Sequence, residues 1–109
     1  MRGKGVGDVV YQSKFHDPMI DDLFQAVLYL CDQEECYRFF EDLCTIGEIK
    51  AMAQRWRVVK MLTDNRTYTD IIQETGVSTA TVSRVKKCLH YGADGYRQIM
   101  ERYRKNNHS

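Results

Sequence analysis

Residues that interrupt helices are scarce in this 109-residue chain, which contains one proline, Pro18, and seven glycines. Three of the glycines lie before residue 10, and the other four are Gly47, Gly76, Gly92 and Gly95. Such a distribution favours helices separated by short turns. The length is enough for one hydrophobic core and too short for two. We therefore expect an all-α fold in a single domain.

Apolar residues recur at steps of three and four along most of the chain, which is the spacing of one face of a helix. Six helices are expected, over residues 18–31, 36–44, 45–64, 67–75, 78–89 and 94–103. The apolar face of the third consists of Ile49, Met52, Ala53, Trp56, Val59 and Leu62. Thr45 and Glu48 have the spacing of a capping box at the start of that helix. Residues 1–16 lack a sustained period, so we predict a flexible N-terminal segment there and a domain over residues 17–109.

The net charge of +1 conceals a strong asymmetry between the two halves of the chain. From His16 to Glu48 nine acids face one base, Arg38, a net charge of −8. From Ile49 onward twelve bases face five acids, a net charge of +7. A basic half is what binding to a polyanion requires, because Lys and Arg neutralise phosphates and release counterions. Solvated helix faces would produce the same asymmetry, so charge alone does not decide between the two interpretations.

The four cysteines lie in predicted helical segments and form no Cys-x-x-Cys pair. They are Cys31, Cys36, Cys44 and Cys88. We expect reduced, mostly buried thiols rather than a disulfide framework or a zinc site. No stretch approaches the roughly 20 apolar residues that span a bilayer, and the start of the chain lacks the apolar core of a secretory signal. The expected location is cytoplasmic, without a membrane partner.

The segment from Thr67 to Leu89 has the layout of a helix-turn-helix. Thr67 and Asp70 can cap its first helix, Gly76 supplies the left-handed residue that ends that helix, and Ser78 caps the second. No acid lies between Ser78 and Tyr91. Small and hydroxyl-bearing residues at the start of a recognition helix fit base edges, and bases further along meet phosphate. The expected DNA-contacting residues are Ser78, Thr79, Ala80, Thr81, Ser83, Arg84, Lys86 and Lys87.

Three stretches carry a family resemblance: Leu43-Cys44-Thr45, Gln54-Arg55-Trp56-Arg57-Val58-Val59, and Glu74-Thr75-Gly76 followed by Thr79-Ala80-Thr81-Val82-Ser83-Arg84. From about Cys36 to Tyr103 the sequence resembles the Trp repressor superfamily, specifically the small Trp-repressor-related proteins of the YerC/YecD type. The resemblance implies a six-helix fold, an intertwined homodimer, and two recognition helices spaced for successive major grooves.

The resemblance also suggests an effector pocket, in which Arg55 and Arg84 match the two arginines that hold tryptophan and Thr45 matches a threonine of that pocket. Two positions depart from the family pattern. Val85 stands where the family has a glycine, and Cys88 where it has a serine that meets the amino group. Added bulk and a lost polar partner both oppose tryptophan. We expect no cofactor, with tryptophan or another small-molecule effector as the lesser alternative.

Two functional hypotheses follow. The first is a sequence-specific DNA-binding transcriptional regulator, a repressor in its simplest form, that acts as a homodimer on double-stranded DNA. The second is a protein-interaction module that uses the acidic N-terminal helices and has no specific DNA binding. Steep salt dependence with sequence selectivity would favour the first. An enzyme is not expected, because no Ser-His-Asp or Cys-His set, phosphate loop or metal motif has suitable spacing.

Overall fold

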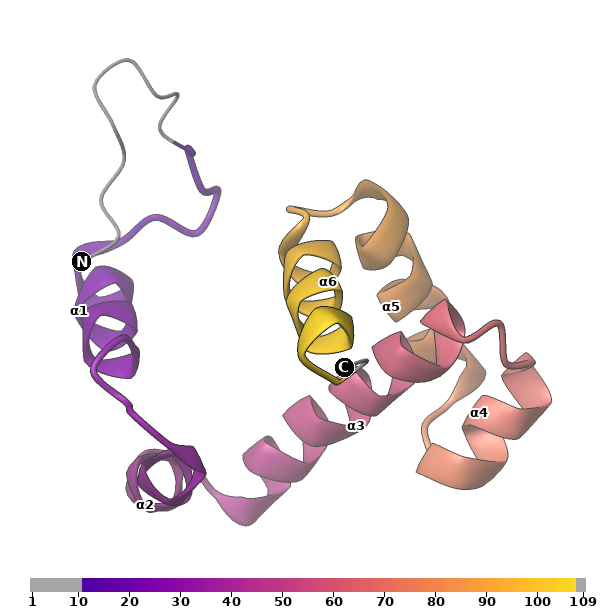
Figure 1. Ribbon diagram of the computed structural model, residues 1–109, viewed down its shortest axis with the longest axis horizontal. Coiled ribbons are helices and arrows are strands. Elements are labelled where there is room, and N and C mark those ends of the chain that lie inside the picture. Colours follow the sequence, from indigo (N-terminus) through magenta and orange to yellow (C-terminus); the bar gives the residue numbers. More distant parts are fainter. Residues whose placement is uncertain (1–10, 108–109) are drawn as a thin grey trace. The chain divides into compact units, whose positions relative to one another are not determined.

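The computed structural model describes residues 11–107, and its regular elements are six α-helices (Figure 1). These are α1 (Pro18–Val27), α2 (Gln33–Leu43), α3 (Ile46–Thr63), α4 (Tyr68–Thr75), α5 (Thr79–Tyr91) and α6 (Gly95–Asn107). No strand occurs within this range, so the all-α prediction with six helices is confirmed. A flexible segment was predicted for residues 1–16. Residues 1–10 of it lie outside the described residues, and residues 11–16 contain a turn and no helix.

The chain divides into two compact units, residues 1–42 and residues 43–109. In the first unit, α1 begins where Asp17 accepts hydrogen bonds from the backbone amides of Met19 and Ile20, at 2.9 and 3.3 Å. The helix ends at Val27, earlier than the predicted end at Cys31. It ends early because the amides of Tyr29 and Leu30 bond to carbonyls three residues back, which closes the last turn tightly.

The second helix begins earlier than predicted. The polar residues 32–35 were expected to form a break, but α2 begins at Gln33. The Asp32 carboxylate accepts from the Glu35 amide at 2.9 Å, and the Glu35 carboxylate accepts from the Cys31 amide at 2.9 Å. The first bond satisfies an amide that a helix start leaves free, and the second ties the Glu35 side chain to the chain just before the helix, so the acidic segment forms the first turn of α2.

No residue among 11–42 is fully buried. The apolar faces of α1 and α2 are instead half-buried or exposed, and Phe24 and Leu28 are 59% and 65% exposed. Both helices are amphipathic, as the three-and-four spacing predicts, but within this unit their apolar faces have no core to enter.

The hydrophobic core lies in the second unit, around the C-terminal half of α3 and helices α4 to α6. Its buried residues are Val58, Val59, Met61, Ile71, Val82, Val85 and Met100. The N-terminus of α3 has the predicted capping box: the Thr45 hydroxyl accepts from the Glu48 amide at 3.2 Å, and the Glu48 carboxylate from the Thr45 amide at 2.8 Å.

The predicted apolar face of α3 is wrong at several positions. Met52 and Ala53 are exposed, whereas Val58 and Met61, which the pattern omits, are buried. The reason is that α4 and α5 contact α3, and α6 packs on it through Trp56 and Tyr96, so its C-terminal half is enclosed from more than one side. Figure 1 shows these helices gathered at that half of α3.

The prediction of mostly buried cysteines in helices is also wrong. Cys31 and Cys88 are exposed, while Cys36 and Cys44 are half-buried. Cys31 lies between α1 and α2, and Cys44 lies just after α2, so two of the four are outside helices. All four are free thiols in this structure. Cys31 and Cys36 are accessible because no residue among 11–42 is fully buried, and Cys88 is accessible because it lies on a flank of α5 away from its buried face.

Candidate nucleic-acid interface

Helices α4 and α5 form the predicted helix-turn-helix. The Thr67 hydroxyl caps α4 by accepting from the Asp70 amide at 3.1 Å. The Asp70 carboxylate does not cap this helix; it pairs with Arg66 at 3.4 Å. The first helix of the motif therefore has one of its two expected caps, and the acid contributes an ion pair in place of the second.

The turn between the helices depends on Gly76. This residue has φ +76°, a left-handed conformation that side chains with a Cβ rarely adopt, and its amide bonds to the Ile72 carbonyl at 2.9 Å. Val77 then packs against the core. The Ser78 hydroxyl caps α5 by accepting from the Thr81 amide at 3.1 Å. Each element of the turn predicted from the sequence is present.

The second helix of the motif has one buried face and one exposed face. Val82 and Val85 are buried and Leu89 is partly buried. The opposite side consists of Thr79, Ala80, Ser83, Arg84, Lys87 and Tyr91, all exposed and together called the α5 outer face. This face contains no acid, and among the described residues neither Arg84 nor Lys87 belongs to an ion pair.

Three of the eight predicted DNA-contacting residues, Ser78, Thr81 and Lys86, already make side-chain contacts within the protein. The hydroxyls of Ser78 and Thr81 lie 3.1 Å apart and bond to each other at the helix start. The Lys86 ammonium lies 5.8 Å from the centre of the Tyr68 ring on α4, a cation–π contact. Their side chains are engaged within the protein, whereas those of Thr79, Ala80, Ser83, Arg84 and Lys87 face outward.

Sequence reasoning missed two residues that shape the end of α5, one on that helix and one on α6. Tyr91 is 85% exposed and follows Lys87 by one helical turn on the α5 outer face; its spacing from Ala80, Arg84 and Lys87 could have revealed it. Arg97 on α6 donates to the backbone carbonyls of Leu89 and His90, at 3.0 and 3.3 Å. It thereby satisfies carbonyls that the helix end leaves free. A contact across eight residues of chain has no local sequence signal.

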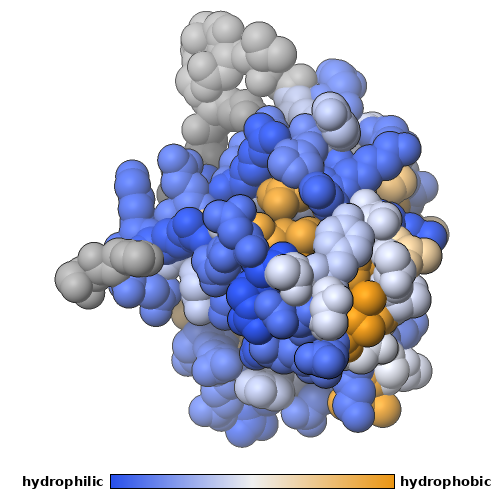
Figure 2. All heavy atoms as spheres, turned by 90° about the vertical axis from the view of Figure 1, so that its right-hand side faces the viewer, coloured by the Kyte–Doolittle hydropathy of each residue, from blue (hydrophilic) through white to orange (hydrophobic). Residues whose placement is uncertain are grey.

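Much of the positive charge elsewhere in the second unit is already paired. Arg57 pairs with Glu74 at 2.9 Å, and Arg104 also forms an ion pair, with Asp64. The Lys60 ammonium lies 4.7 Å from the ring centre of Tyr103 and bonds to its hydroxyl. Arg84 and Lys87 of α5 belong to no ion pair among the described residues, so they are available to a polyanion, whereas part of the positive charge elsewhere in this unit is already engaged. Figure 2, which views the molecule from the side on which α4 lies in Figure 1, shows mostly hydrophilic surface with a few hydrophobic patches.

The structure does not assemble the suggested effector pocket within one chain. Thr45 and Arg55 are ten residues apart across the start and middle of α3, about 15 Å along the axis. The Thr45 hydroxyl is engaged in the capping box. Val85 is buried in the core, and Cys88 is exposed. Arg55 and Arg84 are both exposed. A pocket using Thr45 would have to take that residue from a second copy of the chain.

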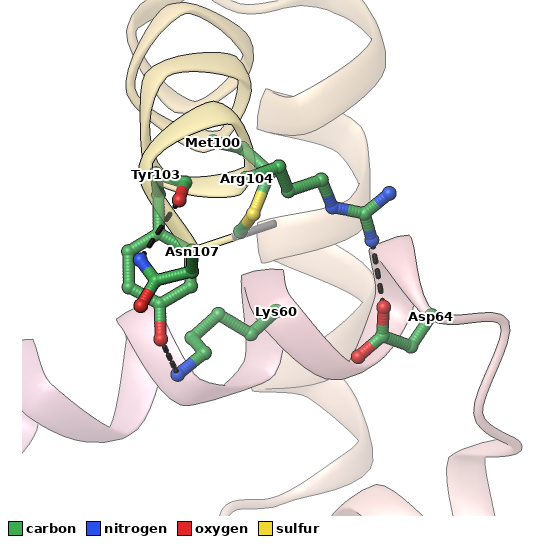
Figure 3. A pocket seen from close by; sticks show the side chains of 6 residues that line it. All are labelled: Lys60, Asp64, Met100, Tyr103, Arg104 and Asn107. Carbon is green, nitrogen blue, oxygen red and sulfur yellow. Dashed lines mark hydrogen bonds and ion pairs between the residues drawn. The ribbon is translucent and has the colours of Figure 1, made fainter. Parts of the chain in front are cut away.

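A cavity of about 350 Å³ lies instead between α3 and α6 (Figure 3). None of the four suggested effector residues lines it; the lining consists of Lys60, Asp64, Met100, Tyr103, Arg104 and Asn107. Its polar groups bond to one another, Lys60 to the Tyr103 hydroxyl, Arg104 to Asp64, and the Asn107 amide to the Tyr103 carbonyl. The cavity therefore offers few free polar groups to a ligand.

Within residues 11–107, no group of three or more His, Cys, Asp or Glu side chains is placed to hold a metal ion. None of the helices described there is long and apolar enough to cross a membrane.

Comparison with known proteins agrees with the fold and the motif. The family model described as Trp repressor protein matches residues 19–104. This chain belongs to the Trp repressor family. YerC, an uncharacterized protein of Bacillus subtilis, is 54% identical over 89 residues, which cover 82% of this chain and 86% of YerC. The resemblance predicted from the sequence is thereby confirmed.

Two solved structures are similar to this member of the family. A candidate Trp repressor from Staphylococcus aureus aligns with a TM-score of 0.78 and 49% identity, over 83% of this chain and 90% of that one. A TrpR-like protein from Eubacterium eligens aligns with a TM-score of 0.79 and 52% identity, over 83% and 93%. The Trp-repressor-like fold is therefore established for this chain, and its family is one of regulators rather than enzymes.

Proposed function

We propose that this protein is a sequence-specific DNA-binding transcriptional regulator that acts as a homodimer and does not require tryptophan. The observation that carries the proposal is the α5 outer face, which is exposed, free of acids, and presented by a helix-turn-helix. Small side chains at Thr79, Ala80 and Ser83 allow close approach to base edges. Membership in the Trp repressor family supports the same conclusion.

In this proposal the N-terminal half of α5 enters the major groove. Thr79, Ala80 and Ser83 meet base edges, and Arg84 and Lys87 meet a base or phosphate further along the helix. Ser78 and Thr81 hold the start of the helix in shape, and the positive end of the helix dipole attracts a phosphate there. Lys86, held over Tyr68, adds charge from the flank. Tyr91 extends the docking face by one turn.

The homodimer is proposed because no residue of the first unit that the structure describes, 11–42, is fully buried. A second copy can cover the apolar faces of α1 and α2, which a soluble chain rarely leaves open. The charges are complementary as well, since the segment from His16 to Glu48 carries −8 and the rest of the domain +7. Two copies related by a two-fold axis present two α5 helices to a palindromic site, and occupation of that site blocks transcription.

Independence from tryptophan rests on Val85 and Cys88. Val85 is 2% exposed and forms part of the core, so its position has no room beside a ligand ring. Cys88 offers only the weak acceptor of its sulfur where a ligand amino group would need a strong hydrogen-bond acceptor. Arg55 and Arg84, both exposed, are then available to phosphates.

Selection of duplexes from a random pool by the purified protein, in parallel with and without tryptophan, tests the proposal. We expect a palindromic sequence to be enriched equally in both arms. Enrichment only with tryptophan would contradict effector independence. Enrichment of no sequence in either arm would contradict DNA recognition and favour the alternative, a protein-interaction module based on α1 and α2. Binding to a protein partner that is insensitive to salt would support that alternative.

A further inference from the structure

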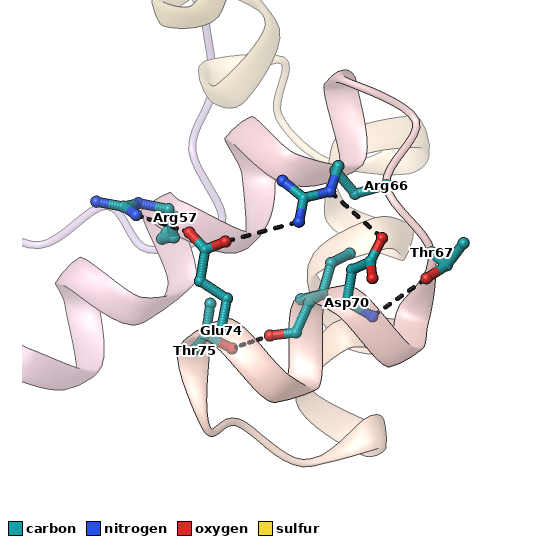
Figure 4. A network of polar contacts seen from close by, with 7 residues as sticks. Arg57, Arg66, Thr67, Asp70, Glu74 and Thr75 are labelled. Atoms are coloured by element: carbon teal, nitrogen blue, oxygen red, sulfur yellow. Dashed lines mark hydrogen bonds and ion pairs between the residues drawn. The ribbon is translucent and has the colours of Figure 1, made fainter.

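The C-terminal end of α4 is tied to α3 by polar side chains (Figure 4). The Glu74 carboxylate accepts from Arg57 on α3 at 2.9 Å, and its other oxygen lies 3.7 Å from Arg66. Arg66 also pairs with Asp70 at 3.4 Å. One turn earlier on α3, the Gln54 amide donates to the Thr75 carbonyl at 3.1 Å. These residues are called the Glu74 cluster: Gln54, Arg57, Arg66, Asp70, Glu74 and Thr75.

The position of Glu74 is unfavourable for its own helix. A carboxylate in the last turn meets the negative end of the helix dipole, where a cation is preferred. Glu74 lies in the last turn of α4, two residues before the left-handed Gly76. Two arginines, one from α3 and one from the segment between α3 and α4, offset that unfavourable placement. The stabilisation from Glu74 therefore comes from tertiary contacts and not from α4 itself.

Helix α4 contacts the core through Ile71 and through the partly buried Tyr68 and Ile72. It is eight residues long, and Ile71 is its one fully buried residue. None of its last three residues, Gln73 to Thr75, adds an apolar side chain to that core. The Glu74 cluster lies at the end that leads through Gly76 into α5, so it bears directly on the angle at which α5 is presented.

We propose that Glu74 is a positioning residue for DNA recognition, which holds α4 and the following turn at a fixed angle to α3 and so sets the orientation of α5. This inference rests on the proposed function. Each ion pair is only partly buried, with Glu74 41% and Arg57 55% exposed, so each contributes modestly. The effect appears in discrimination between DNA sequences more than in folding, because base contacts tolerate less displacement than phosphate contacts.

The proposal predicts opposite changes in two affinities. Glu74→Gln removes a negative charge and releases Arg57 and Arg66, which strengthens attraction to any duplex. The same change loosens α5, which weakens the base contacts that distinguish the selected duplex. A residue that contributed only charge would raise both affinities, and a residue that contributed only stability would lower both.

The test measures the affinity of Glu74→Gln for the selected duplex and for a scrambled duplex at one salt concentration. The matched control is Glu101→Gln, which removes the same charge from an exposed acid of α6 that has no ion pair within the described residues. We expect the ratio of specific to non-specific affinity to fall about fivefold to tenfold below the control, as two partly exposed ion pairs allow. An equal ratio in the two variants, or a parallel loss of both affinities, would overturn the inference. Absence of selectivity in the unmodified protein would instead overturn the proposed function, and the inference with it.

A second variant guards against a trivial loss of folding. Arg57→Gln should lower the same ratio, and the double variant with Glu74→Gln should lose no more than Glu74→Gln alone, because the two side chains act through one contact. Additive losses in the double variant would overturn the assignment. Circular dichroism melts of all variants give the folded fraction at the assay temperature.

Discussion

The two units of the molecule use similar amphipathic helices with different results. In residues 11–42, α1 and α2 carry apolar faces at helical spacing, yet no residue is fully buried. In the second unit, α3 to α6 bury seven residues in one core. The units also differ in charge, since the acids gather from His16 to Glu48 and the bases after Ile49.

This difference shows that an apolar face specifies a helix without specifying what covers it. The second unit has four helices that can enclose one another, whereas residues 11–42 of the first form two short helices and no third element. An exposed apolar face on such helices marks a site where a partner can bind, and the acidic surface around it favours a basic partner. The proposed homodimer supplies such a partner, because the second copy also carries a basic half.

The largest expected effect concerns the core of the second unit. Ile71→Ala should lower the free energy of unfolding by about 2–5 kcal/mol, because Ile71 is completely buried and its removal leaves a cavity. Urea denaturation followed by circular dichroism measures the change. The exposed Ile46→Ala in the same unit is the control. A loss under about 1 kcal/mol for Ile71→Ala would mean that this unit does not owe its stability to the core described here.

A substitution on the apolar face of the first unit should weaken the proposed dimer. If a second copy covers α1, Phe24→Ala removes roughly 1.5–3 kcal/mol of burial from each subunit and weakens the dimer at least tenfold. Sedimentation equilibrium over a range of protein concentrations measures the dissociation constant, with Gln25→Ala as the control. A monomeric parent protein, or the same constant for Phe24→Ala and its control, would leave the apolar face of α1 to a different partner.

Variants on α5 test the assignment of DNA binding to the second unit. Arg84→Ala should cost about 1–3 kcal/mol of binding to the selected duplex if it reads a base. Lys87→Ala should lower the salt slope by about one if it meets a phosphate. Arg102→Ala removes the same charge from an exposed position on α6 and is the control. Affinity indistinguishable from the control in both variants would remove the α5 outer face as the docking surface.

The smallest expected effect concerns the acidic charge of the first unit. The Glu35 carboxylate raises the pKa of the Cys31 thiol, with smaller contributions from burial, a hydrogen bond and Asp32. Because a raised pKa leaves less thiolate at a given pH, Cys31 should react slowly with iodoacetamide at pH 8, and Glu35→Gln should speed the reaction. Mass spectrometry of the labelled peptide gives the rate. Glu34→Gln, whose carboxylate pairs with Arg38, is the control; an equal rate in both variants would show that Glu35 does not set this pKa.

Local signals in the sequence predicted the helix-turn-helix well. Thr67, Gly76 and Ser78 occupy the predicted cap and turn positions, because each acts through backbone bonds within a few residues. The capping box of Thr45 and Glu48 was predicted for the same reason. Family resemblance and local pattern together gave the fold and the outer residues of α5.

Contacts between distant residues were not predictable in this way. Burial of Val58 and Met61 depends on how α4, α5 and α6 surround α3, which periodicity along α3 does not encode. The pairing of Glu74 with Arg57 joins residues 17 positions apart. The bonds from Arg97 to the carbonyls of Leu89 and His90 join residues eight and seven positions apart. The suggested effector pocket stays a prediction, because Thr45 and Arg55 match family positions without being neighbours along α3.

The central claim, that the protein reads DNA sequence through α5, is tested most directly by titrating the unmodified protein with the selected duplex and a scrambled duplex at several salt concentrations. We predict that log affinity falls linearly with log salt for both duplexes, and that the selected one binds at least about 10³-fold more tightly at physiological salt. Equal affinity for the two duplexes, or affinity that does not change with salt, would contradict the claim.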